Sequence, residues 1–195
     1  MSVNKLCVIL IACALCILPS AASIGQTCTT EVFNVPKPGG GCCEISVEWC
    51  WTVNGNSVSV LIGTLTVPQD CYLVISPGLF NYLRKKMLYR LSQRGQIAQA
   101  IPNCPERAVY IVTTSQSACY QRNVQVAPGA DLVYSGCGTA LCTKTCEMCL
   151  STQETDDCNN NEPMLQYLGC QVSGGACVSN GSGFNDCNVN TCDSN

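Results

Sequence analysis

Residues 43–67 read CEISVEWCWTVNGNSVSVLIGTLTV, and this stretch decides the fold. Apolar and polar residues alternate with a period of two from Cys43 to Val53, as they do in a half-buried β-strand. The next two residues, Asn54 and Gly55, favour a hairpin loop because both tolerate a positive φ. Residues 57–67 are therefore predicted to form the return strand of a β-hairpin.

The register of this hairpin follows from the position of its loop. A two-residue loop at 54–55 places three apolar pairs on one face, namely Trp51 with Val58, Trp49 with Val60 and Val47 with Ile62. Aromatic and β-branched residues in opposite positions stabilise neighbouring strands. A slip of one residue would turn all these side chains to the other face, so we expect the register to be firmly set.

A helix is predicted over residues 77–94. Ser76 can cap its first turn, Pro77 suits its first position, and Gly95 can end it. Its apolar residues recur every three or four positions and form one stripe, which consists of Phe80, Leu83, Met87 and Leu91. Further strands are expected at 107–114, 119–126 and 131–135.

The order strands, helix, strands predicts an α+β fold, in which an antiparallel sheet carries one packed amphipathic helix. Beyond residue 137 Gly, Ser, Asn, Asp and Cys dominate, which predicts an irregular, disulfide-rich C-terminal region. Residues 145–195 contain seven acidic residues and no basic one. The chain is therefore divided into a signal peptide at 1–22, an α+β domain at 23–137 and a cysteine-rich acidic region at 138–195.

The signal peptide is predicted from three features of the first residues. Lys5 supplies a positive charge, residues 6–18 form an apolar run, and Ser20-Ala21-Ala22 fits cleavage before Ser23. The apolar run is short for a membrane-spanning helix, and no second run is long enough. The mature chain is thus expected to be secreted, extracellular and without a membrane segment.

The chain has 19 cysteines and no histidine. Three cysteines lie in the predicted signal peptide, and the other sixteen can form eight disulfides, a density typical of oxidising compartments. The cysteines predicted to form disulfides are Cys28, Cys42, Cys43, Cys50, Cys71, Cys104, Cys119, Cys137, Cys142, Cys146, Cys149, Cys158, Cys170, Cys177, Cys187 and Cys192.

The positions of these cysteines constrain their pairing. Seven lie before residue 120 and nine lie after residue 136, so at least one disulfide has to join the two groups if all sixteen pair. The simplest solution pairs Cys137 with a cysteine of the first group. Neighbouring residues of a strand point to opposite faces, so Cys42 and Cys43 are expected to have different partners.

Three later cysteines could carry other chemistry. Cys142, Cys146 and Cys149 have the spacing C-x3-C-x2-C, which resembles the iron–sulfur ligand motif of radical S-adenosylmethionine enzymes over eight residues. Export would oxidise such thiols, so disulfides are the expected state and no cofactor or metal is predicted. Two alternatives are a redox pair of Cys146 with Cys149, and a zinc site that also includes Cys137.

The missing histidine excludes every mechanism that depends on a histidine base, and no catalytic residue is predicted. A carboxylate hydrolase that uses Glu44 and Glu48 remains an alternative. However, four residues of strand hold these two residues about 13 Å apart, which is farther than the separation of the two catalytic carboxylates in glycosidases. Residues 156–162 read DDCNNNE, which lacks the EF-hand spacing and is expected to be a solvated acidic turn. Asn180-Gly181-Ser182 is a glycosylation sequon.

The predicted helix carries the most basic surface of the chain. Its candidate binding residues, which lie opposite or beside the apolar stripe, are Tyr82, Lys85, Lys86, Tyr89 and Arg90. Basic residues interleaved with tyrosines can hold an anionic partner, such as an acidic polysaccharide or an acidic protein. The alternative is that the acidic C-terminal region of the same chain covers this face.

These observations predict a secreted, disulfide-stabilised protein that acts by binding or as an extracellular structural component. Without Lys5 the chain has nine basic and thirteen acidic residues, a net charge of −4, which argues against nucleic acid as a partner. A secreted enzyme that needs no histidine and a small effector or inhibitor are the alternatives. The ligand and the oligomeric state do not follow from the sequence.

Overall fold

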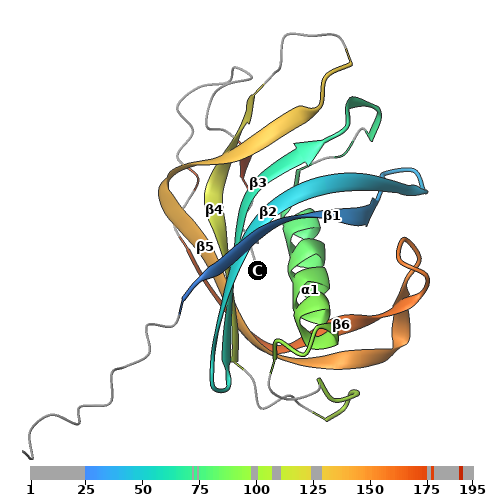
Figure 1. The fold of residues 1–195 in the computed structure, drawn as a ribbon, viewed down its shortest axis with the longest axis vertical. Coiled ribbons are helices and arrows are strands. Elements are labelled where there is room, and N and C mark those ends of the chain that lie inside the picture. The colour runs from blue at the N-terminus through green and yellow to red at the C-terminus, as the bar shows by residue number, and fades with distance from the viewer. Residues whose placement is uncertain are drawn as a thin grey trace, which may run out of the picture.

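A strongly curved sheet wraps around a long helix (Figure 1). The computed structural model describes residues 25–71, 73, 75–97, 101–106, 111–123, 129–174, 177 and 189–190. The predicted signal peptide, Asn180, Cys187 and Cys192 lie outside these residues. The elements in chain order are β1 (Thr27–Pro36), β2 (Cys42–Asn54), β3 (Ser57–Val67), the 3₁₀ helix η1 (Gln69–Cys71), α1 (Pro77–Gln93), β4 (Ile111–Asn123), β5 (Leu132–Asp156), β6 (Glu162–Gly174) and β7 (Val189–Asn190). The strand order is β1-β2-β3-β4-β5-β6, with β7 paired to β4.

The predicted hairpin is confirmed, but its register is shifted by two residues. Its turn consists of Gly55 and Asn56 rather than Asn54 and Gly55. Gly55 has a φ of 54°, a conformation that glycine adopts without strain at the first position of a tight turn. A shift of two residues preserves the faces of both strands. The observed core pairs are Trp51 with Val60, Trp49 with Ile62 and Val47 with Leu65.

The hairpin also contains a β-bulge that the predicted register lacks. Gly63 and Thr64 together lie opposite Glu48. A regular ladder would have turned the polar Thr64 toward the core. The extra residue changes the phase of β3 and brings Leu65 and Val67 to the concave face, where both are buried.

Helix α1 confirms the predicted start, stripe and end. Its N-cap is Ser76, whose Oγ accepts a hydrogen bond of 3.3 Å from the backbone N–H of Leu79. Pro77 is the first residue, and Gly95 follows the C-cap with a φ of 65°. All four residues of the predicted apolar stripe are fully buried against the concave face of the sheet.

The sheet is mixed, which corrects the prediction of an antiparallel sheet. β3 and β4 are parallel neighbours, while the other neighbouring strands are antiparallel. Two consecutive parallel strands need a crossover, and α1 provides it by carrying the chain back across the concave side (Figure 1). The sequence patterns of β3 and β4 do not indicate whether these two strands run parallel or antiparallel.

Strand β4 joins two strands that were predicted separately. The two predicted ranges left out residues 115–118, which include the polar residues Ser115, Gln116 and Ser117 and lie inside the strand. Gln116 is buried and accepts a hydrogen bond from Arg84 of α1, while Ser115 shares a hydrogen bond of 3.1 Å with Thr143 of β5. Partners from other elements therefore keep polar residues within the strand. Residues 107–110 and 124–126 of the predicted strands lie outside the described residues.

Residues 138–174 are mostly strand, which corrects the prediction of an irregular region after residue 137. β5 is 25 residues long, and the expected boundary at 137 falls inside it. β6 pairs with β5, with register shifts between Thr145 and Glu147 and between Leu150 and Thr155. Each shift changes which residues face inward, so no single period runs through this part of the sequence.

The core lies between the concave face of the sheet and α1. Trp49 and Trp51 stack with ring centroids 4.8 Å apart, and Phe80 of the helix contacts Tyr120 of β4 at 5.0 Å. Because the sheet curls around the helix, α1 is buried on more than its apolar stripe. The largest fully buried side chains are Trp49, Tyr120, Phe33, Phe80, Ile45, Leu65, Leu83, Met87, Leu88, Leu91 and Met148.

Disulfides join neighbouring strands of the sheet, and they also join strands to segments outside the sheet. Those with both sulfurs in the described residues are Cys28–Cys50, Cys42–Cys158, Cys43–Cys71, Cys104–Cys149, Cys119–Cys177 and Cys146–Cys170. Cys137 and Cys142 are disulfide-bonded as well. Cys42 and Cys43 have different partners, as predicted.

Three of these disulfides, at Cys42, Cys104 and Cys119, join the early group of cysteines to the late group. All seven cysteines of the early group are thereby bonded to residues other than Cys137, so the predicted backward pairing of Cys137 is wrong. Three bridges are an odd number, so parity is satisfied, and each of them joins a strand of the sheet to a segment outside the strands.

Candidate functional site

Lys86 is buried in a polar cluster between α1 and the β5–β6 turn. Its side chain is 3% exposed, and its ammonium lies 2.9 Å from Asp156 Oδ2 and 2.5 Å from Glu162 Oε2. The Asp156 side chain is 3% exposed as well. A cation and a carboxylate that are both removed from water have to be paired. The helix therefore positions the lysine, and the β5–β6 hairpin supplies its acids.

Asp156 accepts further hydrogen bonds in this cluster. The Tyr82 hydroxyl donates to Oδ2 at 2.7 Å, the Asn159 amide donates to Oδ2 at 2.8 Å, and the Cys158 backbone N–H donates to Oδ1 at 3.1 Å. Burial alone raises the pKa of Asp156, but the hydrogen bonds from Tyr82 and Lys86 outweigh burial and lower that pKa. Burial and the bond to Asp156 raise the pKa of Tyr82, so its hydroxyl stays protonated.

The segment 156–162 is therefore not the solvated acidic turn that the sequence predicted. Asp156 and Glu162, at its two ends, both contact Lys86. Asn160 and Asn161 turn the chain with positive φ values of 53° and 55°, a conformation that asparagine tolerates better than most residues. The acidic residues of this turn attach the hairpin to the helix.

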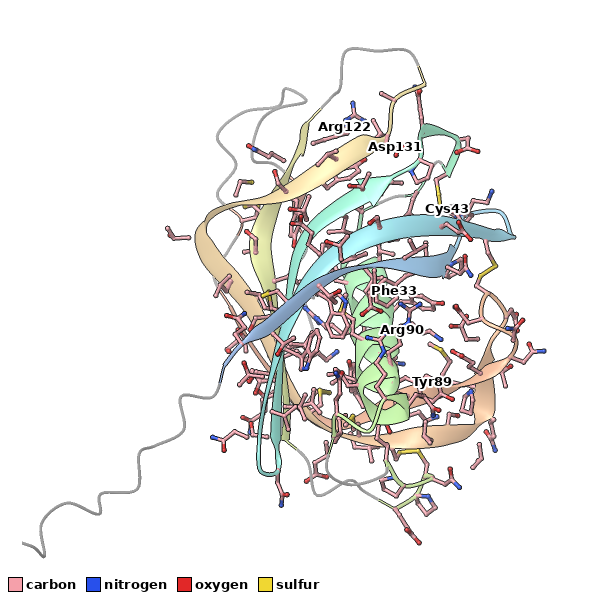
Figure 2. All side chains as sticks on the ribbon, viewed as in Figure 1. Phe33, Cys43, Tyr89, Arg90, Arg122 and Asp131 are labelled. Carbon is pink, nitrogen blue, oxygen red and sulfur yellow. A yellow bond between two sulfur atoms is a disulfide. The ribbon has the colours of Figure 1, made fainter. Side chains whose placement is uncertain are left out.

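Arg90 and Arg94, at the end of α1, both bind Glu31 of β1. Arg90 Nη1 lies 2.7 Å from Oε2 and Arg94 Nη1 lies 2.7 Å from Oε1. The Arg90 guanidinium also lies over the ring of Phe33, 4.0 Å from its centroid, where β1 crosses the helix (Figure 2). Burial raises the pKa of Glu31, but the hydrogen bonds from Arg94 and Arg90 outweigh it and the pKa is lowered.

Lys85 points toward β5 and β6. Its ammonium lies 5.7 Å from the ring centroid of Tyr167, and the Lys144 ammonium lies 5.4 Å from the same centroid. Burial lowers the pKa of Lys85, Glu154 opposes this shift, and the like charge of Lys144 adds to it. Lys85 is half-buried, and β6 lies beside it.

The five candidate binding residues share one helix but do not form one open basic face. Tyr82 and Lys86 contact Asp156, and Arg90 contacts Glu31. The fifth candidate, Tyr89, is half-buried with its ring 5.5 Å from the Lys86 ammonium. The contacts of Tyr82 and Lys86 with Asp156 are those expected if the acidic C-terminal region covers this face, whereas the partner of Arg90, Glu31, lies outside that region.

Cys146 and Cys149 are not bonded to each other. Cys146 is bonded to Cys170 in β6, and Cys149 is bonded to Cys104. Redox, zinc and iron–sulfur chemistry at these positions would require thiolates, and both sulfurs are in disulfides. In the part of the chain that the structure describes, no three acidic, cysteine or histidine side chains gather as metal ligands would.

A hollow opens on the convex face of the sheet, at the β2–β3 bulge. Its volume is about 330 Å³, and we call it the outer hollow. Alternation along β1, β2 and β3 turns its exposed side chains away from the helix. Its lining residues are Cys28, Thr29, Thr30, Glu48, Trp49, Cys50, Leu61 and Gly63.

The bulge and one disulfide shape the outer hollow. Because Gly63 and Thr64 oppose the single residue Glu48, β3 bends locally beside β2. Gly63 leaves space there, since a Cβ at this position would lie 3.2 Å from the backbone carbonyl oxygen of Glu48. Cys28 and Cys50 are register partners on β1 and β2, and their disulfide ties these two strands together at the wall of the hollow.

The outer hollow combines apolar walls with one charged group. The Cys28–Cys50 disulfide and Leu61, which is 37% exposed, supply apolar surface. Among the described residues, Glu48 is the only charged one in its lining, and neither a lysine nor an arginine of that part of the chain contributes to it. Apolar walls with a few polar groups are typical of small-molecule sites.

The outer hollow was not predicted, although the sequence contains a signal for it. Glu48 was considered only together with Glu44, as a possible catalytic pair. Gly63 interrupts the alternation of residues 57–67 and changes its phase at Leu65. A glycine within a strand pattern indicates a bulge or a close approach of another backbone, and the structure contains both.

A second cavity of about 240 Å³ lies beside the N-terminus of α1. Two of its polar side chains already have partners, since Ser76 caps the helix and Tyr82 donates to Asp156. The lining residues are Pro36, Lys37, Pro38, Leu73, Ser76, Gly78, Leu79 and Tyr82. The outer hollow is the better candidate because, within the described residues, the Glu48 carboxylate makes no side-chain hydrogen bond or ion pair.

The described residues contain no helix that combines the length and the apolar character needed to cross a membrane. Fourteen cysteines within the described residues are disulfide-bonded, which makes this a disulfide-stabilised protein of the kind found outside cells. Comparison of the chain with models of protein families, with curated proteins and with solved structures found no match.

Proposed function

We propose that this is an extracellular binding protein that takes up a small molecule in the outer hollow. The observation that carries the proposal is an apolar-walled hollow of about 330 Å³ with one carboxylate, built on strands rather than on loops. Ligand pockets have volumes of about 300–1,000 Å³, so this one suits a small ligand. The Cys28–Cys50 disulfide limits the movement of its walls, and a preformed site loses less entropy when it binds.

Binding is favoured over catalysis by the residues present. The chain has no histidine, and Glu48 is the only charged residue that lines the outer hollow in the part of the chain that the structure describes. General acid–base catalysis by carboxylates needs a second group near the first. Glu44 lies four residues away on the same strand and does not line the hollow. We therefore propose a non-enzymatic role.

Secretion is part of the proposal. It is supported by the predicted signal peptide and by the disulfide-bonded cysteines, which a reducing cytosol would not maintain. Expression of the full chain in a secreting eukaryotic host should release a protein that begins at Ser23, as read by intact mass. Retention of the first 22 residues together with free thiols would contradict this part of the proposal.

Binding can be tested with a panel of one-ring alcohols, amines and acids, observed by saturation-transfer NMR. Leu61→Arg places a long charged side chain at the hollow and should abolish the signal of every compound that binds there. The matched control is Leu141→Arg, because Leu141 is 49% exposed on β5 and lies outside the hollow. The proposed function is wrong if no compound of the panel binds the unmodified protein. It is also wrong if every compound that binds the unmodified protein still binds Leu61→Arg.

A further inference from the structure

We infer that the outer hollow selects a small amphipathic amine, with its ammonium group at Glu48 and its apolar part against the Cys28–Cys50 disulfide and Leu61. This inference rests on the proposed function and adds the chemical class of the ligand. It follows from the charge of the lining, from its hydrogen-bond acceptors and from its size.

The charge of the lining favours a cation. Among the described residues, Glu48 carries the only charge in the lining of the outer hollow, and the mature chain as predicted has a net charge of −4. Glu48 is exposed, so water screens its attraction for a cation, and the apolar walls beside it reduce this screening. The same carboxylate repels an acid, and it also opposes an amino acid, whose own carboxylate would enter the hollow with the amine.

Side-chain oxygens of the lining can accept the hydrogen bonds that an ammonium group donates. An ammonium has three N–H donors and no acceptor. The Glu48 carboxylate can accept one of these donors in a charge-assisted hydrogen bond, and the Thr30 hydroxyl can accept another. Gly63 lies close to the backbone of Glu48, where a Cβ would come within 3.2 Å of its carbonyl oxygen, so no side chain covers Glu48 from this position.

The apolar part of the ligand is limited by the volume of the hollow. A hollow of about 330 Å³ lies at the lower end of the range of ligand pockets, which corresponds to one ring with a short arm. Leu61 and the Cys28–Cys50 disulfide supply the surface against which a ring can pack. An arylalkylamine combines this size with a single positive charge.

Three probes of nearly equal shape test this inference: phenethylamine, phenethyl alcohol and phenylacetate. Dissociation constants are measured by calorimetry at pH 7 and low salt. We expect the amine to bind about tenfold more tightly than the alcohol, and phenylacetate to bind more weakly than both. Added NaCl should weaken the binding of the amine and leave the binding of the alcohol unchanged, because only the binding of the amine depends on charge.

Two variants locate the charge. Glu48→Gln keeps the shape of the side chain and should bring the affinity of the amine to that of the alcohol, without changing the affinity of the alcohol. The matched control is Glu44→Gln, which removes a carboxylate from the same strand outside the hollow and should change neither affinity. Circular dichroism of both variants verifies that they fold.

The outcomes separate this inference from the proposed function. If amine and alcohol bind equally and Glu48→Gln changes neither, the selection for an amine is wrong while binding in the hollow stands. If none of the three probes binds, or if Leu61→Arg binds the amine as the unmodified protein does, the site itself is wrong and both proposals fail.

Discussion

Replacing Asp156 by alanine tests how strongly the buried ion pair attaches helix α1 to the β5–β6 hairpin. The substitution removes a carboxylate that lies 2.9 Å from the ammonium of Lys86. Lys86 stays buried, and Glu162 at 2.5 Å becomes the acid that neutralises it. The Glu162 side chain is 42% exposed, so water screens this second contact more than it screens the first.

The expected loss is about 3 kcal/mol in the free energy of unfolding. Breaking a buried ion pair by removing one partner costs about 3–5 kcal/mol. The lower end applies because Lys86 keeps Glu162, and because Tyr82 and Asn159 keep the carbonyl oxygen of Asn34 as an acceptor at 3.0 and 3.1 Å. In a chain of this length, a loss of about 3 kcal/mol lowers Tm by about 6–12 °C.

Equilibrium denaturation in urea measures this loss with the disulfides intact. Trp49 and Trp51 are both buried, so their fluorescence reports the loss of the core. The matched control is Asp157→Ala, which removes the neighbouring, exposed carboxylate and should change the free energy of unfolding by less than about 0.5 kcal/mol.

A double variant tests the physical cause. Lys86→Met together with Asp156→Ala removes the buried cation as well as its partner, so it should be more stable than Asp156→Ala alone. The reasoning is refuted if Asp156→Ala loses less than about 1 kcal/mol, or if the double variant is less stable than Asp156→Ala.

Three further predictions concern the buried carboxylates, one disulfide and one close approach between strands. The pKa values of Glu31 and Asp156 are lowered in the folded state, so the contribution of these carboxylates to stability is complete above the unfolded-state pKa values of about 4 and is lost as the pH falls through the lower folded-state values. The urea midpoint should therefore be similar at pH 7 and pH 5 and should decrease below about pH 4. An unchanged midpoint below pH 4 would contradict the shifts. Replacing Cys42 and Cys158 together by alanine opens a disulfide that spans 116 residues and should lower the free energy of unfolding by about 2–5 kcal/mol, measured by the same denaturation, whereas equal stability would show that the remaining bridges suffice. Gly174→Ala would place a Cβ 2.7 Å from a backbone carbonyl oxygen of β5 and should cost about 1–3 kcal/mol; an unchanged Tm would show that the strands adjust.

Features that depend on neighbouring residues could be predicted from the sequence. The helix was predicted because Ser76, Pro77 and Gly95 act within one turn of its ends, and each plays its predicted part. The β2–β3 hairpin was predicted for the same reason. Its register was not, because the choice between a turn at 54–55 and a turn at 55–56 depends on which side chains meet across the strands.

Features that depend on distant residues could not be predicted. Gln116 and the serines beside it were left out of the two predicted strands that β4 joins, but Arg84 of the helix and Thr143 of β5 supply partners for this part of β4. The outer hollow depends on three strands and a bulge, and only Gly63 indicated it. The basic residues of the helix suggested an open face. Whether this face is open or covered depends on where Glu31 and the β5–β6 turn lie in the fold.

The sequence by itself determined the local elements and the need for disulfides between the two halves of the chain. The alternation of residues 43–67, the caps of α1 and the odd numbers of cysteines are all properties of the chain read in order. Only the tertiary structure decided that β3 and β4 are parallel, that Lys86 is buried beside Asp156 and that Glu48 lies in a hollow. The physical reason is that burial, ion pairing and strand direction depend on which segments meet after the sheet has curled around the helix.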